Sequence, residues 1–232
     1  MRIVYHERVD SSVLPGSATA DTYVSCIEII NIDAHAATMI NTINDTSWIH
    51  ALNPIAMASY EATALRTINK LITIFQSVQG QVTKDFGEFM ISMSAGECLK
   101  QKEKHNVVPL SELWKEKISN NHGFDFHTES PQEKISFGEA KYNSNSNSYT
   151  AAASQIIRFI DERKDEGDAV HLAHLVSLNA MHNLLSKKRG FVVAFSLNSP
   201  NHQDILDNAI RSSDIQELST QCDELYIIGV RV

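Results

Sequence analysis

The chain has 232 residues, of which 43% are apolar and 21% charged, and its formal net charge is −8. This composition is typical of a globular protein, and the length suits one sizeable domain or a small domain attached to a larger core. No apolar run is long enough to span a bilayer, and the N-terminal residues lack the apolar core of a secretory signal, so we expect a cytoplasmic protein that does not contact membrane.

The charge balance limits the ways in which this chain could hold nucleic acid. Proteins that bind DNA by themselves usually carry an excess of Lys and Arg, whereas here 28 acidic residues outnumber 20 basic ones. A nucleic-acid substrate would therefore need a local basic patch, a metal ion or a basic partner. The three cysteines, Cys26, Cys98 and Cys222, fit neither a zinc site nor a disulfide framework, and we expect them to be packing residues.

Residues 1–80 read as an N-terminal α/β region that could dock a partner. β-Branched residues favour a strand at its start, and apolar residues that recur every three or four positions favour helices after it. The predicted elements are a strand over 21–32, a helix over 33–52 that ends before Pro54, and an amphipathic helix over 56–78 with Gly80 as its C-terminal stop.

Residues 81–232 alternate between helical and strand patterns, which predicts an α/β (α+β) core with a mixed central sheet flanked by helices. The predicted elements are a helix over 84–102, strands over 123–127 and 134–142 around a turn at 130–133, helices over 149–163 and 168–188, a strand over 191–197, a helix over 204–212 and a strand over 225–232.

The strand over 134–142 carries the residues of greatest chemical interest. Side chains alternate along a strand, so Glu139 and Lys141 share one face with the apolar Ile135 and Phe137. The other face carries only small residues, which suits close packing against a helix. A carboxylate and an ammonium thus point the same way at the end of a mostly apolar strand.

Asp125 precedes this pair on the other side of the turn. If the two strands pair as a hairpin, Asp125 and Glu139 face each other, and two close carboxylates need a cation between them. Hard oxygen ligands select Mg²⁺ or Mn²⁺. Such an ion would polarise a scissile phosphate and lower the pKa of a bound water, while Lys141 would orient that water or neutralise developing charge.

Simpler interpretations compete with each of these assignments. An acidic-x-Lys pattern alone is often a solvated ion pair, and here only the apolar flanks and the upstream Asp125 strengthen it. Gln155, on the following helix, could hydrogen-bond the water or the lysine, or it could be a surface amide. Glu88, near the start of the helix over 84–102, could be a further metal ligand, or an acidic residue favoured by the helix dipole.

In this order, these pieces resemble the PD-(D/E)XK nuclease superfamily, and more specifically the nuclease subunits of the Hachiman anti-phage defence system (DUF1837). The stretches that carry the resemblance lie within roughly residues 82–165. They are FGEFM (86–90), VPLSELWKEK (108–117), GFDFH (123–127), ISFGEAKY (135–142) and AAASQIIRFI (151–160).

The resemblance implies a restriction-endonuclease-like core in which Asp125, Glu139 and Lys141 are the catalytic trio. Glu88 then matches the acidic residue of the first core helix, and Gln155 the glutamine that some branches carry on the following helix. The implied activity is Mg²⁺-dependent cleavage or nicking of DNA. The implied partner is a superfamily 2 helicase that holds the nuclease near DNA during antiviral defence.

Three alternatives remain open at this stage. The chain could be a non-catalytic interaction subunit on a nuclease-like scaffold, or an RNase of a toxin-like module. The histidines at 171, 174 and 182 could bind zinc, although no acidic or cysteine ligands accompany them, so surface or core histidines are the simpler interpretation.

Overall fold

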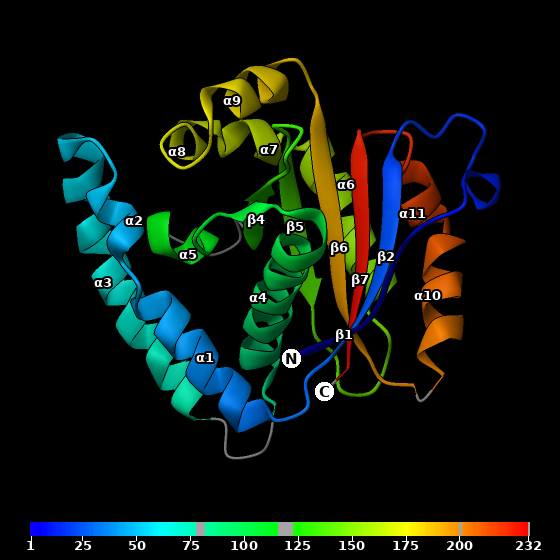
Figure 1. Cartoon of the computed structure of the whole chain (residues 1–232), viewed down its shortest axis with the longest axis horizontal. Coiled ribbons are helices and arrows are strands. Elements are labelled where there is room, and N and C mark those ends of the chain that lie inside the picture. Colours follow the sequence, from blue (N-terminus) through cyan, green and yellow to red (C-terminus); the bar gives the residue numbers. More distant parts are fainter. Residues whose placement is uncertain (78–81, 116–122, 200, 232) are drawn as a thin grey trace.

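The computed structural model describes residues 1–77, 82–115, 123–199 and 201–231. In this part of the chain, a seven-stranded sheet forms the centre of the molecule and helices lie on both of its faces (Figure 1). The predicted α/β class with a mixed central sheet is therefore confirmed. The strands are β1 (Arg2–Arg8), β2 (Asp21–Glu28), β3 (Asn106–Val107), β4 (Phe126–Glu129), β5 (Ile135–Lys141), β6 (Arg189–Leu197) and β7 (Glu224–Arg231).

The sheet has the order β1-β2-β7-β6-β5-β4-β3. The four strands β2, β7, β6 and β5 run parallel, whereas β1, β4 and β3 pair antiparallel at the two edges. Parallel strands need cover on both faces, and every residue of β6 is buried. Because β2 pairs with β7, the sheet includes strands from both sides of the boundary that the sequence suggests at residue 80.

One long helix covers each face of the sheet next to β5. Helix α4 (Lys84–Glu103) packs on β4, β5, β6 and β7, and α6 (Tyr149–Asp161) packs on β5 and β6. Figure 1 shows α4 in front of the sheet and α6 behind it. Helix α11 (Ser213–Leu218) packs against α6, and α10 (His202–Ile210) lies against β7. Strand β5 is thus enclosed between two helices.

Helices α1 (Ile32–Asn44) and α3 (Pro54–Gln76) pack against each other and form an arm that contacts α4 (Figure 1). Asn53 caps α3, because its side chain accepts hydrogen bonds from two backbone N–H groups of the first turn. This confirms one long amphipathic helix from Pro54 onward. The predicted helix end at residue 78 and its stop at Gly80 lie outside the described residues.

The single helix predicted over 33–52 is wrong, since the chain forms α1 and a separate short α2 (Ser47–His50). Asp45 lies between them, and its carboxylate accepts a hydrogen bond from the N–H of Ser47 at 3.0 Å. Short polar side chains offer the backbone such local partners, which compete with helix continuation.

The helix predicted over 168–188 is also wrong, since α8 (Ala169–Leu172) ends early and α9 (Leu178–Leu185) starts afresh. Ser177 separates them and caps α9 by accepting from the N–H of Ala180. The N–H of Ser177 itself donates to Glu129 on β4 at 3.2 Å. A tertiary contact therefore breaks a periodicity that is continuous in the sequence. The remaining short helices are η1 (Ser11–Val13), α5 (Ser111–Trp114) and α7 (Lys164–Gly167).

Two further findings concern whole-chain expectations. The three cysteines are free and buried, as expected for packing residues. Among the described residues, no helix combines the length and apolar character that a bilayer-crossing segment needs.

Strand β1 is absent from the predicted elements. It is an edge strand in which no residue is fully buried, so its sequence carries little hydrophobic signal.

Candidate active site

Asp125 lies where the pairing between β4 and β5 ends. The strand predicted over 123–127 begins only at Phe126, which pairs with Gly138, and the N–H of Asp125 adds one more hydrogen bond to the Gly138 carbonyl at 2.9 Å. Beyond this point the N–H of Ala140 donates to Oδ2 of Asp125 at 3.0 Å. The carboxylate therefore lies against the backbone between the two predicted site residues of β5.

Glu139 and Lys141 form an ion pair on one face of β5. The Nζ of Lys141 donates to Oε1 of Glu139 at 2.5 Å. Glu139 is only 1% exposed, whereas the Lys141 side chain retains 22% exposure. The second oxygen of Glu139, Oε2, is buried without a hydrogen-bond partner. A buried carboxylate oxygen in this state is costly unless a ligand completes it.

Burial and the neighbouring carboxylates disfavour the ionised form of Glu139. Burial is the main cause that raises the pKa of Glu139 well above its usual value, and the nearby Asp125 and Glu88 raise it further, while Lys141 opposes them. For Lys141, burial lowers the pKa, but the surrounding carboxylates outweigh burial and the pKa is raised. Asp125 and Glu88 thus add to the negative potential at Glu139, and a divalent cation would offset it.

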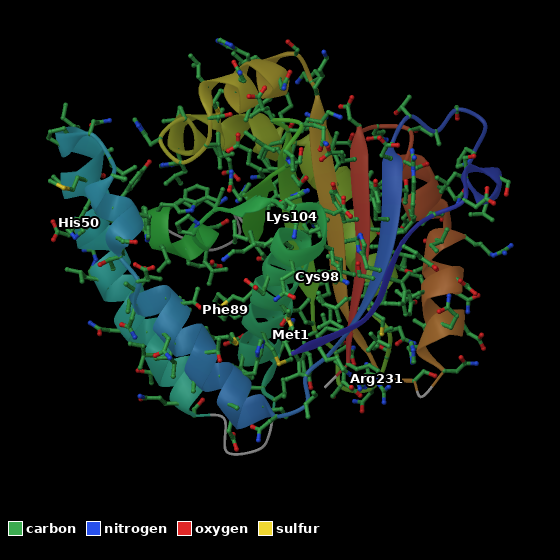
Figure 2. All side chains as sticks on the ribbon, in the orientation of Figure 1. Met1, His50, Phe89, Cys98, Lys104 and Arg231 are labelled. Atoms are coloured by element: carbon green, nitrogen blue, oxygen red, sulfur yellow. The ribbon has the colours of Figure 1, made fainter. Side chains whose placement is uncertain are left out.

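A cavity of about 470 Å³ opens beside these residues. Its walls come from the arm, from α4, from α5 and from the segment before β4, and Figure 2 shows Phe89 on the side of α4 that faces the arm. The lining residues are Thr67, Lys70, Leu71, Ile74, Asp85, Glu88, Phe89, Ser92, Glu112, Lys115 and Asp125. Two of the acids that act on Glu139, namely Glu88 and Asp125, are therefore open to this cavity.

Glu88 reaches the site because the start of α4 lies close to the end of β5. A Cβ on Gly87 would fall 2.2 Å from the ring of Tyr142, so only glycine permits this approach. The first turn of α4 contains Asp85, and Glu88 lies beyond it. The helix dipole acts mainly within the first turn, so it explains Asp85 better than Glu88.

Gln155 is not brought to the trio in this arrangement. It lies half-buried on α6, which packs on the β5–β6 side of the sheet away from α4. Within the described part of the chain, no hydrogen bond joins it to Asp125, Glu139 or Lys141. The structure therefore assembles Asp125, Glu139, Lys141 and Glu88 and leaves Gln155 apart.

A buried polar chain next to the cavity has no counterpart in the sequence predictions. Lys115 Nζ donates to both oxygens of Asp168 at 2.9 and 2.8 Å, Asp168 Oδ2 lies 3.2 Å from His127 Nε2, and His127 Nδ1 lies 3.3 Å from Ser111 Oγ. Burial raises the pKa of Asp168, but the hydrogen bond with His127 and the charge of Lys115 outweigh it and lower the pKa. These residues come from three separate segments, so their spacing carries no signal.

Two of the three histidines considered for zinc, His171 and His174, serve other contacts. His171 Nδ1 lies 3.0 Å from the hydroxyl of Tyr60, and His174 Nδ1 lies 3.4 Å from Nδ2 of Asn53. Both contacts tie residues 171–174 to the first half of α3 and its N-cap. Across the residues that the structure describes, no three His, Cys, Asp or Glu side chains are grouped so as to hold a metal ion. A complete set of three side-chain ligands is therefore not formed in this arrangement.

Mg²⁺ requires fewer protein ligands than such a set, because it is commonly held by one or two carboxylates and keeps several waters. The unpartnered Oε2 of Glu139 and the neighbouring carboxylate of Asp125 fit that requirement. The case for the site depends on these residues alone. Comparison with protein-family models, with curated proteins and with solved structures finds no match for this chain.

Proposed function

We propose that this chain is a metal-dependent nuclease of the PD-(D/E)XK type that cleaves or nicks DNA. The observation that carries the proposal is the buried Oε2 of Glu139, which lacks a partner although Asp125 and Lys141 lie beside it. Ligand-binding carboxylates are often held in such desolvated, mutually repelling groups, which is why perturbed pKa values mark functional sites.

The proposed roles follow from the positions of the side chains. Asp125 and Glu139 would hold Mg²⁺ or Mn²⁺, which supplies positive charge next to the scissile phosphate. Lys141 is partly buried, and its raised pKa keeps it charged. It would orient the attacking water and neutralise negative charge that develops on the phosphate. Glu88 would add negative charge at the metal side of the cavity. The contacts described assign no such role to Gln155.

We further propose that the enzyme acts as the effector subunit of an anti-phage defence complex with a superfamily 2 helicase. The net charge of −8 and the acidic lining of the cavity support dependence on a partner, because neither attracts DNA by itself. Cleavage that rises at least severalfold when the helicase is added would support this part, and equal cleavage without it would contradict it.

The test of nuclease activity is plasmid nicking in Mg²⁺ by the wild-type chain, Glu139→Gln and Lys141→Met. Both variants should lose at least about 100-fold in rate, since each removes a charged group from the transition state. Glu162→Gln is a matched control, because Glu162 is exposed and forms an ion pair of 3.6 Å with Lys164 at the same acidic-x-Lys spacing. Unchanged nicking in both site variants contradicts the proposal, and single-stranded RNA as a second substrate tests the RNase alternative.

The second candidate function is a non-catalytic interaction subunit on the same scaffold. It is favoured by the ion pair in which Lys141 neutralises one oxygen of Glu139, and by the lack of three grouped metal ligands among the described residues. Calorimetric titration with Mn²⁺ separates the two functions. Binding that Asp125→Asn abolishes supports the nuclease, whereas no heat of binding in the wild type supports the scaffold.

A further inference from the structure

We propose that His127 is a positioning residue for the candidate metal site, because it holds the segment that fixes the backbone of Asp125. This inference deepens the proposed nuclease function and rests on it. It assigns a role to the buried polar chain of Ser111, His127, Asp168 and Lys115, which the catalytic trio leaves unexplained. The observations that carry it are the partners of both ring nitrogens, the packing of the ring and the contacts between α5 and β4.

The segment that leads into α5 lies beside the start of β4. The N–H of Val108 donates to the His127 carbonyl at 3.0 Å. The N–H of Ser111 donates to the Asp125 carbonyl at 3.4 Å, which is long for such a bond. The backbone of Asp125 is thus held by Ser111 on one side and, through its own N–H, by Gly138 on the other. A shift of Ser111 would therefore turn the Asp125 backbone and move its carboxylate.

Both ring nitrogens of His127 have partners. Nε2 lies 3.2 Å from Oδ2 of Asp168, and Nδ1 lies 3.3 Å from Oγ of Ser111. A carboxylate only accepts hydrogen bonds, so in the neutral ring the hydrogen is on Nε2. Nδ1 is then an acceptor, and the hydroxyl of Ser111 donates to it. Asp168 therefore selects the form of the ring that can hold Ser111.

Aromatic rings enclose the imidazole of His127, which is fully buried. The ring of Phe137 meets it edge-on, with centroids 5.1 Å apart and an interplanar angle of 78°, and the ring of Trp114 lies tilted at 5.4 Å. This packing fixes the ring plane, so the two nitrogens stay aimed at Ser111 and Asp168. A hydrogen bond lost here would leave a polar atom unsatisfied in an apolar enclosure, which is costly.

Lys115 closes this chain of contacts at the end of α5. Its Nζ donates to both oxygens of Asp168 at 2.9 and 2.8 Å, and its backbone N–H donates to the Ser111 carbonyl at 3.0 Å. The contacts therefore run from Ser111 through His127 and Asp168 and return along α5. Buried networks of this kind restrict the elements that they join. Both ends of α5, which forms a wall of the cavity, are in this way tied to β4 through His127.

The test compares two buried histidines by Mn²⁺ calorimetry, by plasmid nicking in Mg²⁺ and by urea unfolding. His127→Phe keeps an aromatic ring and removes both hydrogen bonds. His105→Phe is the matched control, because His105 is also buried and has partners at both nitrogens, Thr128 at 2.8 Å and Tyr226 at 3.1 Å. Both variants should unfold at lower urea concentrations than the wild type. Only His127→Phe should also weaken Mn²⁺ binding and slow nicking, each by about 10-fold or more.

Two amide variants separate positioning from the filling of space. In His127→Asn the amide lies near the place of Nδ1, so its oxygen can accept from Ser111. In His127→Gln the amide extends towards Asp168 and leaves the Ser111 hydroxyl without that acceptor. His127→Asn should therefore bind Mn²⁺ at least about 5-fold more tightly than His127→Gln. A role in packing alone predicts the reverse order, because Gln fills more of the space that the ring leaves.

Equal Mn²⁺ affinity in His127→Phe and His105→Phe overturns the inference, and so does binding by His127→Gln that is as tight as binding by His127→Asn or tighter. If His127→Phe does not fold, the two amide variants decide alone. If the wild type binds Mn²⁺ in a way that depends on Asp125 and nicks plasmid, the nuclease proposal survives a failure of this inference; if the wild type binds no Mn²⁺, both fail.

Discussion

The two oxygens of the Glu139 carboxylate have very different surroundings. One is paired with Lys141, and the other is buried without a hydrogen-bond partner. Burial and the neighbouring acids raise the pKa of this group well above 4.5, so the folded chain holds a proton there more tightly than the unfolded chain does. If Glu139 holds a metal ion as proposed, a proton and a divalent cation compete for the same oxygen, and this competition can be measured.

At the residue scale we predict a pH-dependent stabilisation by Mn²⁺. Between pH 4.5 and the raised pKa of Glu139, the folded state binds more protons than the unfolded state, so without metal this group contributes less stability as pH rises. Mn²⁺ replaces the proton. At about 100 times its dissociation constant, Mn²⁺ should raise the Tm by about 5–10 °C at pH 8, and by clearly less at pH 5.5.

Thermal unfolding of the wild type and Glu139→Gln at both pH values, with and without Mn²⁺, checks this prediction. The variant should show no Mn²⁺ shift at either pH. An equal shift in both proteins would mean that Mn²⁺ binds elsewhere on the chain.

At the scale of elements, the site is a product of two close approaches. Strand β5 continues beyond Gly138, its last residue paired with β4, without β4 beside it. The N–H of Ala140 therefore donates to the Asp125 carboxylate and not to a strand carbonyl. Helix α4 comes so near to the end of β5 that Gly87 lies directly against Tyr142. The approach of α4 requires glycine at position 87, and both contacts bring a carboxylate towards Glu139.

We expect Gly87→Ala to disturb this approach. The added methyl would overlap the Tyr142 ring, starting with the Cγ atom at 2.2 Å, so the variant should lose about 1–3 kcal/mol of unfolding free energy. It should also weaken Mn²⁺ binding, because α4 would carry Glu88 outward. Urea unfolding and Mn²⁺ calorimetry measure the two effects.

Gly167→Ala is the matched control, since a Cβ at Gly167 meets nothing within 4 Å. If Gly87→Ala proves as stable as this control, α4 can move relative to β5 without cost, and the close approach does not hold Glu88 in place.

At the scale of the whole molecule, the first strands are part of the same sheet as the last. Strand β2 pairs with β7 over the full length of both, and its residues Cys26 and Ile27 are fully buried. Between β2 and β7 in the chain, α1 and α3 form an arm that extends past α4 (Figure 1). Residues of α3 line one wall of the cavity beside the candidate site. The N-terminal third of the chain thus contributes both to the core and to this cavity.

We predict that residues 81–232 do not fold on their own. Without β2, the edge of β7 and a buried apolar face are open to water, a combination that favours aggregation. A chain that begins at Val9 lacks only the edge strand β1, which has no fully buried residue, and should remain folded. Size-exclusion chromatography and circular dichroism of both chains decide this. A monomeric, cooperatively unfolding 81–232 chain would contradict it.

The local patterns of the sequence predicted most of the single elements. Periodic apolar residues located α3 and α4, β-branched runs located β2, β6 and β7, and the alternation of β5 placed Glu139 and Lys141 together. These patterns succeed because they depend on neighbours within a few positions, which the chain order already specifies.

Other features were decided only by tertiary contacts. The contact of Ser177 with Glu129 ends one helix and starts another, and the chain from Lys115 through Asp168 to His127 joins distant segments. The separation of Gln155 from the trio also follows from the side of the sheet on which α6 packs. The sequence by itself determined that Glu139 and Lys141 share one face of β5, because strand alternation is local. The cavity, the burial of Glu139 and the place of the arm were decided by packing, because they arise from elements that meet only when the whole sheet has formed.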